Sequence, residues 1–473
     1  MSSRKRKLLS DTILYTVGEF GSKTISFFLV PFYTRYLTTA EYGIMDFINT
    51  TKSLILPMIY FQIVASVYRF LLDQDENNPY EVISTAFYFS LSMILVSSII
   101  FLTIHSYFNL DIEYIYLIML MFIVTLFSGL FKEILRGLNK IKLYSFSGII
   151  ITFITALLNV YFIGFLDMSY NGMILATTFS LGFIILFIVL FGKIYKYLSF
   201  NYFRKKILVN MLKYSLPLLP NVINWWIMNV SDRYLIRYFL GFNSLGIYAI
   251  ANKFASILFL VNSIFYKSWQ TSAITEYESI SRDEYYTEIF NYLMKFQLLL
   301  VLIITISIKY LMIFLVGASF ISAWQYVPFL LLGAMFYSFS MFYGTGYLSS
   351  KNTMAAFWTT IIGAIINIAL NLLLISRIGI IAAAISTFIA YLSLWILRIK
   401  TTQKYFSISI EYSSLIMGLI LIFVSMGLNY LESTIFSLLG QISILLIFLI
   451  HNKDTIIKLV IDGIKFIKEK TKR

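Results

Sequence analysis

YSLPLLPNVINWWIMNVSDRYLIRYFLGFNSLGIYAIANK, residues 214–253, is the stretch that decides the fold of this chain. An apolar segment opened by two prolines runs past Arg233, turns through a Gly/Asn/Ser loop and becomes apolar again at Gly246. The beginning of the chain follows the same order, because an apolar segment ends at Arg35 and another starts at Gly43 after a short turn. When two parts of a chain show the same order of apolar segments and turns, separated by a fixed number of residues, an internal duplication is predicted.

The offset between matching residues is nearly constant along the chain. Separations of 202 to 208 relate the pairs Arg35/Arg237, Gly43/Gly246, Thr152/Thr360, Ala156/Ala364, Asn159/Asn367 and Gly172/Gly379. We therefore predict an N-terminal six-helix lobe over residues 1–200 and a C-terminal six-helix lobe over residues 201–405. Residues 406–473 would add two accessory helices and a basic amphipathic tail.

Composition indicates a polytopic membrane protein. Hydrophobic residues make up 59% of the chain and charged residues 13%, against roughly 25% charged in soluble domains. The mean hydropathy is +0.82. Apolar runs long enough to cross a bilayer recur from end to end.

These runs predict an all-α integral membrane protein of about 14 transmembrane helices. The predicted spans are 12–36, 42–70, 82–104, 112–135, 143–165, 170–192, 208–236, 245–270, 286–308, 325–348, 353–375, 379–399, 410–430 and 434–451. Six spans per repeat return each copy to the same orientation. The two six-helix repeats are therefore predicted to be parallel, with two further C-terminal helices, and this arrangement is typical of transporters with a site between the halves.

The basic residues are unequally divided between the two predicted sides of the membrane. One side carries 28 of the 37 Lys and Arg residues and the other carries five. The excess predicts that both termini are cytoplasmic and that the protein lies in the cytoplasmic (inner) membrane. It also explains the net charge of +14 without nucleic-acid binding.

Both ends of the chain carry additional basic patterns. The N-terminal RKRK before an apolar run resembles a signal peptide, but the run carries charges and no cleavage pattern, so we interpret it as the first span. Residues 455–468 place isoleucines on one face and lysines around it, which predicts a helix lying on the inner leaflet.

Residue types that perform common enzyme chemistry are scarce. The chain has no cysteine, and His105 and His451 stand alone, so neither a metal site nor a cofactor is predicted. Residues 241–246 have the glycine spacing of a phosphate-binding loop but no following Lys-Ser/Thr. Asp73-Gln-Asp75 could be a metal-binding pair of a glycosyltransferase, but in a short loop a solvated turn is favoured. We predict that the protein is not an enzyme.

Polar stripes at helical spacing mark span faces turned away from lipid. They are Glu19, Ser22, Lys23 and Ser26 in the first span, Asp46, Asn49, Thr50, Ser53 and Pro57 in the second, and Pro217, Asn221, Asn224, Met228 and Asp232 in the seventh. The alternative is that such stripes only let helices pack closely, and we favour it for the uncharged stripes of spans 143–165 and 353–375. Prolines within the spans, Pro57 among them, predict bends.

Four lysines fall inside predicted spans, where each charge costs at least ~2.5 to 3.5 kcal/mol in lipid. A water-filled cationic cavity between the halves would remove most of that cost and attract an anion. The predicted substrate-binding residues are Lys23, Lys52, Lys253, Arg233 and Lys295, and the predicted polar or coupling residues are Glu19, Asp46, Asn49, Asn221, Asn224 and Asp232. Alternatives stay open: Glu19 and Lys23 as an ion pair, Lys295 extending its amine toward water, and Arg233 as an interfacial anchor.

Three segments carry a resemblance to a known family. They are residues 35–43 (RYLTTAEYG), residues 136–140 (RGLNK), and residues 214–248 with YSLPLLP, DRYLI and GIY in order. In these segments the chain resembles the polysaccharide (lipid-linked oligosaccharide) flippases of the multidrug/oligosaccharidyl-lipid/polysaccharide exporter superfamily.

The resemblance implies a function as well as a fold. It implies translocation of undecaprenyl-diphosphate-linked oligosaccharide repeat units by alternating access, for O-antigen or capsule biosynthesis. The cavity lysines would hold the diphosphate, and polymerases and glycosyltransferases would be partners. One alternative is a multidrug and toxin extruder, which exports cations from an acidic cavity and fits a lysine-rich interior poorly. The other is a membrane glycosyltransferase or polymerase.

Overall fold

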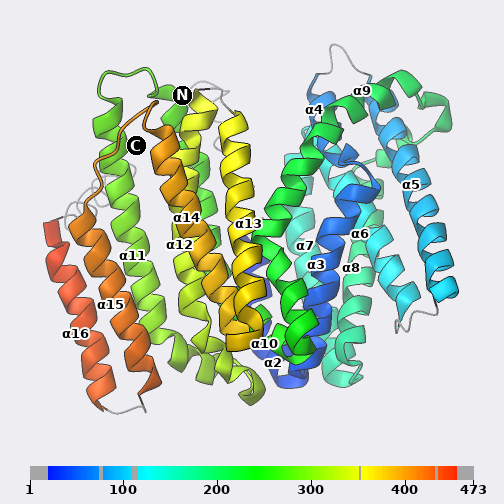
Figure 1. Cartoon of the computed structure of the whole chain (residues 1–473). Helices are drawn as coiled ribbons and strands as arrows, with labels where there is room; N and C mark the ends of the chain where they lie inside the picture. Colours follow the sequence, from blue (N-terminus) through cyan, green and yellow to red (C-terminus); the bar gives the residue numbers. More distant parts are fainter. Residues whose placement is uncertain (1–19, 74–77, 109–113, 351–352, 432–434, 455–473) are drawn as a thin grey trace, which may run out of the picture. The chain divides into compact units, whose positions relative to one another are not determined.

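The computed structural model describes residues 20–73, 78–108, 114–350, 353–431 and 435–454, and within these ranges it contains helices and no strands (Figure 1). The residue contacts divide the chain into two compact units, Met1–Tyr234 and Leu235–Arg473. The predicted all-helical fold class is confirmed.

The first unit begins with a helix over residues 20–28. Its further helices are α2 (Val30–Tyr36), α3 (Thr39–Ile59), α4 (Ile63–Leu72), α5 (Pro79–Phe108), α6 (Ile115–Gly137), α7 (Ile141–Asn159), η1 (Val160–Phe165), α8 (Ser169–Phe191), η2 (Ile194–Tyr197), η3 (Phe200–Tyr202), α9 (Lys205–Ser215), η4 (Leu216–Leu218) and the start of α10 (Leu219–Thr275).

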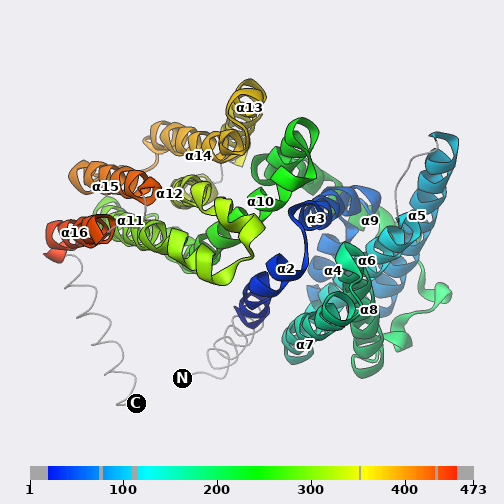
Figure 2. The same cartoon turned by 90° about the horizontal axis from the view of Figure 1, so that it is seen from below.

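The second unit begins within α10. Its further helices are α11 (Arg282–Leu315), η5 (Ala318–Gln325), α12 (Val327–Ser349), α13 (Thr353–Ile378), α14 (Ile380–Thr402), α15 (Tyr412–Tyr430) and α16 (Ile435–His451). In this unit α12, α13 and α14 pack together, while α15 packs on α11 and α16 on α15 (Figure 2).

The unit boundary differs from the boundary predicted from the repeat. Helix α9 packs against α4 and α5, so residues 205–234 group with the first unit although the repeat places them in the second lobe. The repeat boundary comes from matching residues in the sequence, whereas the unit boundary comes from contacts between residues. The lobes over residues 1–200 and 201–405 and the C-terminal segment 406–473 therefore remain predictions.

The number of membrane spans is lower than predicted when counted by length and composition. Ten helices in the described ranges are long and apolar enough to cross a membrane, or up to eleven if the bent pair α3–α4 is one span. One of them, Lys205–Thr275, covers two predicted spans, and Ile435–His451 has only 17 residues. The first predicted span begins outside the described residues. The number fourteen is not confirmed.

The second predicted span is broken in the middle. Helices α3 and α4 meet at an angle of 60° across a short break. At the break Phe61 and Gln62 adopt left-handed backbone angles, four residues after Pro57. The Ser215 hydroxyl donates a hydrogen bond of 2.8 Å to the carbonyl of Phe61, which the break leaves without a helical partner. The bend predicted from Pro57 is therefore present, and Ser215 at the end of α9 stabilises it.

A second break divides α10 at the predicted loop between spans seven and eight. Gly241 has φ 81° and ψ −179°, backbone angles that residues with a side chain rarely adopt. The chain therefore changes direction within the segment that the sequence predicted as a turn.

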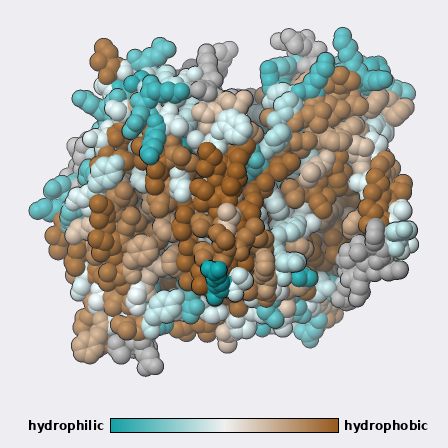
Figure 3. All heavy atoms as spheres, in the orientation of Figure 1, coloured by the Kyte–Doolittle hydropathy of each residue, from teal (hydrophilic) through white to brown (hydrophobic). Residues whose placement is uncertain are grey.

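The face that the helices turn outward is apolar. In each unit the visible helix surfaces are largely hydrophobic, and hydrophilic residues gather near helix ends (Figure 3). Exposed large side chains include Phe101, Phe183, Leu186 and Ile365. An exposed apolar surface of this extent is stable in lipid and not in water.

Gly137 supplies a test of packing in the first unit. A Cβ at this position would lie 2.6 Å from the Cβ of Leu71, which is fully buried in the contact between α4 and α6. We expect Gly137→Ala to lower the free energy of unfolding by about 1–3 kcal/mol through overpacking. Thermal unfolding in detergent measures the change. Gly129→Ala in the same helix has open space around the new methyl group, so it is the matched control, and equal melting temperatures for both variants would contradict the packing.

Candidate functional site

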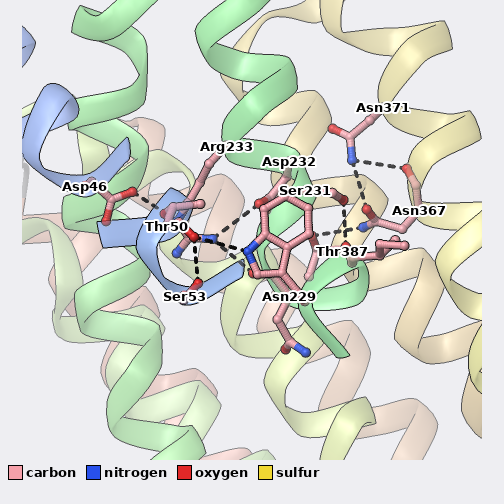
Figure 4. A network of polar contacts seen from close by, with 12 residues as sticks. Asp46, Thr50, Ser53, Asn229, Ser231, Asp232, Arg233, Asn367, Asn371 and Thr387 are labelled. Atoms are coloured by element: carbon pink, nitrogen blue, oxygen red, sulfur yellow. Dashed lines mark hydrogen bonds and ion pairs between the residues drawn. The ribbon is translucent and has the colours of Figure 1, made fainter. Parts of the chain in front are cut away.

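Arg233 joins two helices of the first unit through charged contacts. Its Nε donates to Asp46 Oδ2 of α3 at 3.0 Å, and its Nη1 donates to Asp232 Oδ1 at 3.3 Å and to the Asn229 carbonyl at 3.0 Å (Figure 4). The side chains of Arg233, Asp46 and Asp232 are 12%, 20% and 4% exposed. We call these three residues the Arg233 cluster.

Neutral contacts hold the same two helices together beside the cluster. The Trp226 indole donates to the Thr50 carbonyl at 3.2 Å. The Tyr234 hydroxyl lies 2.7 Å from Thr51 Oγ1, and its ring packs on Phe47 with centroids 4.7 Å apart. Successive turns of α3 thus contact the first part of α10. These contacts hold the Asp46 side chain toward Arg233.

The Arg233 guanidinium is shared between two carboxylates, Asp46 and Asp232. Burial strengthens such contacts because water screens them less. Carboxylates therefore already neutralise Arg233, which the sequence placed among the substrate-binding residues.

Lys52 lies six residues after Asp46 on α3. Its Nζ donates to Asn49 Oδ1 at 2.9 Å, and the residue is partly buried. Within the described ranges no carboxylate forms an ion pair with it. The structure thus brings together Lys52 and Asn49, two predicted site residues, and leaves the ammonium charge of Lys52 without a counter-charge.

The other predicted residues of the first unit are less enclosed. Lys23 and Asn221 are exposed and Asn224 is partly buried. Next to Lys23, the Ser22 hydroxyl donates to the Gly148 carbonyl at 2.9 Å, so that part of the stripe packs against α7. Glu19 lies outside the described residues.

In the second unit the predicted lysines differ from each other. Lys253 is exposed on α10. Lys295 is buried on α11, and its Nζ lies 2.6 Å from Glu411 Oε2 just before α15. The charge of Lys295 is therefore neutralised within its own unit, an arrangement that the sequence alternatives did not include because Glu411 follows so much later in the chain.

The Lys295–Glu411 pair belongs to a longer contact between α11 and the segment that precedes α15. Every fourth residue of α11 contacts every second residue of residues 407–411: Asp283 with Ser407, Thr287 with Ser409, Asn291 with Ser409 and Glu411, and Lys295 with Glu411. The two spacings match because four residues of a helix rise about 6 Å and two residues of an extended segment span about 6.6 Å. This contact fixes the C-terminal helices to α11.

Unequal burial of the pair gives a directional prediction. The Lys295 side chain is 10% exposed and the Glu411 side chain 49%, so Glu411→Gln removes a carboxylate that faces a buried ammonium, whereas Lys295→Met leaves a carboxylate that water can solvate. We expect Glu411→Gln to lower the free energy of unfolding by about 1–2 kcal/mol, discounted for exposure, and Lys295→Met by less. Thermal unfolding of both variants in detergent measures this order. The reverse order would show that Lys295 does not depend on Glu411.

Uncharged polar stripes act in packing. Asn367 on α13 donates to Thr387 Oγ1 on α14 at 3.3 Å, and Asn371 donates to the Asn367 carbonyl at 3.1 Å (Figure 4). The first of these bonds joins α13 to α14 and the second lies within α13, so this part of the stripe of predicted span 353–375 takes part in helix packing. Among the described residues, no group of three His, Cys, Asp or Glu side chains could hold a metal ion.

Solved structures with the same fold are transporters. The lipid II flippase MurJ in an inward closed conformation aligns with a TM-score of 0.70 and 18% identity, over 94% of this chain and 100% of MurJ. An inward-facing MATE family transporter of the MOP superfamily aligns with a TM-score of 0.64 and 12% identity, over 83% of this chain and 95% of the transporter. An outward-facing MATE family transporter of the MOP superfamily aligns with a TM-score of 0.58 and 15% identity, over 87% of this chain and 94% of the transporter. At these identities the likeness establishes the fold.

Sequence comparison identifies the family. No curated protein matches the chain in sequence. A family model described as polysaccharide biosynthesis protein matches residues 8–269, which is more than half of the chain and includes the Arg233 cluster and Lys52. The match also covers the three segments on which the resemblance rests. The chain therefore belongs to the polysaccharide biosynthesis protein family.

Proposed function

We propose that this protein is a flippase that moves undecaprenyl-diphosphate-linked oligosaccharide repeat units across the cytoplasmic membrane by alternating access. The observation that carries the proposal is Lys52, a partly buried lysine in a membrane helix without a carboxylate partner among the described residues. Family membership supports the substrate class, because surface polysaccharides are assembled from lipid-linked units. No cofactor is needed, since no covalent bond changes.

In this mechanism the diphosphate of the substrate supplies the missing counter-charge. The headgroup and sugars enter a water-filled cavity that contains Lys52, Lys23 and Lys253, while the prenyl chain stays in lipid. Removing phosphate charges from water is costly, and ammonium groups in the cavity offset that cost. Movement of the two repeats then exposes the headgroup on the outer side.

Coupling to an ion gradient is assigned to the Arg233 cluster. Carboxylates are groups that bind protons and cations, and the cluster contains two of them, one on α3 and one on α10. Occupation of the cluster would change how firmly these two helices hold each other. Asp46 and Asp232 are therefore proposed as coupling residues and Arg233 as the residue that positions them.

Orientation and partners complete the proposal. The excess of Lys and Arg on one side supports cytoplasmic termini in the inner membrane. Glycosyltransferases that assemble the lipid-linked unit would act before this step and a polymerase after it.

An extruder of organic cations is the second candidate, because the MATE transporters share the fold. The two carboxylates of the Arg233 cluster, Asp46 and Asp232, are the observation that favours it. Lys52 disfavours it, since a cationic substrate would be repelled by an ammonium on the neighbouring turn of α3.

Reconstitution separates these functions from each other and from an enzyme. Purified protein in liposomes receives a fluorescent undecaprenyl-diphosphate oligosaccharide in one leaflet, and a membrane-impermeant quencher measures its arrival in the other. We expect transfer that is faster than in protein-free liposomes, with no new glycosidic bond in the recovered lipid. Efflux of an organic cation without lipid transfer would support the extruder, and a longer oligosaccharide would support a polymerase.

A further inference from the structure

Arg398 is a buried arginine of the second unit. The sequence analysis counts it among the basic residues of the cytoplasmic side, at the end of the predicted span 379–399. In the structure it occupies α14, one turn before that helix ends at Thr402, and it is 6% exposed. Helix α14 packs with α12 and α13 (Figures 1 and 2). The Arg398 side chain contacts Ser340 of α12 and Thr360 of α13.

Neutral groups are the only hydrogen-bond acceptors that the described residues offer to Arg398. Nη1 donates to the Ser340 carbonyl at 2.8 Å, and Nη2 donates to Thr360 Oγ1 at 3.2 Å. The guanidinium carbon lies 5.9 Å from the centre of the Tyr347 ring. Nε is buried and has no acceptor in the part of the chain that the structure describes. Within the described ranges Arg398 forms no ion pair, in contrast to Arg233 and Lys295.

An unpaired buried guanidinium is costly for a fold. Removing the charge from water is unfavourable, and a carbonyl, a hydroxyl and an aromatic ring compensate it only in part. The carboxyl end of α14 adds a small favourable term. An apolar residue of similar size at this position would make the fold more stable, so the presence of a charge points to a ligand.

The guanidinium lies close beneath one face of α12. Gly344 has no side chain to cover it, and a Cβ there would lie 2.8 Å from Nη1. Tyr337, Met341 and Gly344 are three to four residues apart and all partly exposed, whereas most of α12 is buried. Thr360 on α13 is partly exposed as well. Arg398 therefore lies directly beneath a partly open face formed by these residues.

We propose that Arg398 is a phosphate-binding residue in the second unit, which contacts the diphosphate of the lipid-linked substrate near the predicted cytoplasmic side. This inference rests on the proposed function and adds a named ligand contact to it. A guanidinium offers Nε and one Nη as parallel donors, a geometry that matches two phosphate oxygens. Nε has no acceptor among the described residues, and the Thr360 hydroxyl bound to Nη2 can donate to the same phosphate.

Binding measurements with lipids that differ only in the headgroup test the proposal. Purified wild-type protein and Arg398→Gln in detergent are titrated with undecaprenyl diphosphate, with undecaprenol, which has no phosphate, and with inorganic pyrophosphate. We expect Arg398→Gln to weaken undecaprenyl diphosphate binding about tenfold or more and to leave undecaprenol binding unchanged. Arg377→Gln, at an exposed arginine near the end of α13, is the matched control and should bind as the wild type does.

Each outcome of the titration bears on the proposal. Equal affinity of wild type and Arg398→Gln for undecaprenyl diphosphate would overturn it, and so would an equal loss for undecaprenol. A loss of pyrophosphate binding in Arg398→Gln would support recognition of phosphate without the prenyl chain. Pyrophosphate that binds neither protein, with the expected loss for the diphosphate lipid, would support recognition of the lipid headgroup. If wild-type protein binds no undecaprenyl diphosphate, the proposed function itself fails.

Stability and a neighbouring glycine separate ligand binding from a structural role. If Arg398 serves the ligand, Arg398→Gln should melt at or above the wild-type temperature without lipid, and a large decrease would overturn the proposal. Gly344→Ala leaves the charge in place but displaces Nη1, so we expect it to weaken diphosphate lipid binding several-fold. Gly427→Ala on α15, where the added methyl group meets nothing within 4 Å, is its control. Wild-type binding by Gly344→Ala would contradict access from this face.

Discussion

Replacing Arg233 with alanine should lower the free energy of unfolding by about 3–5 kcal/mol, the cost of leaving a buried charge without its partner. The guanidinium is the cation that faces both Asp46 and Asp232, and all three side chains are largely buried. Its removal would leave two carboxylates close together and would remove a contact between α3 and α10. Thermal unfolding in detergent, with protein level in membranes as a second readout, measures the loss.

Variants of the partners show whether charge is the cause. Arg233→Ala combined with Asp46→Asn and Asp232→Asn contains no charge in the cluster, so it should recover much of the lost stability. Arg237→Ala, four residues further along α10 at an exposed position, should change stability little because its described contact is the Phe242 ring at 4.3 Å. A single variant Arg233→Ala that melts with the wild type would mean that the cluster does not hold these helices together.

Loss of transport is the expected result for Lys52→Ala, with flipping about 10–100-fold slower and normal protein level. A charge-assisted hydrogen bond to a phosphate contributes about 1.5–3 kcal/mol, and this range corresponds to such a factor. Lys52→Arg keeps the charge and should retain most of the activity. The liposome assay measures the rate, and the amount of surface polysaccharide measures it in cells.

Controls distinguish the charge of Lys52 from the polar environment. Asn49→Ala removes the hydrogen-bond acceptor of Lys52 and keeps the charge, so its effect should be smaller. Lys196→Ala, at an exposed lysine of η2, should be neutral. We expect Lys23→Ala and Lys253→Ala to reduce transport as well. Full activity in all three alanine variants of the cavity lysines would remove the cationic cavity from the mechanism.

Much of the fold could be predicted because its causes are local. Apolar runs long enough to span lipid must satisfy their backbone hydrogen bonds within themselves, so they form helices whatever they pack against. The turn at Gly241 and the bend after Pro57 also follow from residues at those positions. The family could be recognised from segments such as residues 35–43 and 214–248, and the match over residues 8–269 confirms it.

The candidate site could be predicted only in part, because a charge is defined by its partners. Hydropathy marks a lysine as lying within a span but does not identify the carboxylate beside it. Lys52 and Lys295 look alike in the sequence, yet one contacts an asparagine and the other forms an ion pair with Glu411. The binding roles assigned to these lysines remain predictions.

The sequence by itself determined the membrane class, the helices and the family, since hydropathy, turn residues and motifs act over short stretches of chain. Tertiary structure alone decided which charges are neutralised and which are buried: Arg233 meets Asp46 across 187 residues, and Arg398, at the end of a predicted span, is enclosed by the second unit. The physical reason is that electrostatic energy depends on distance in space and on burial, and packing between helices sets both.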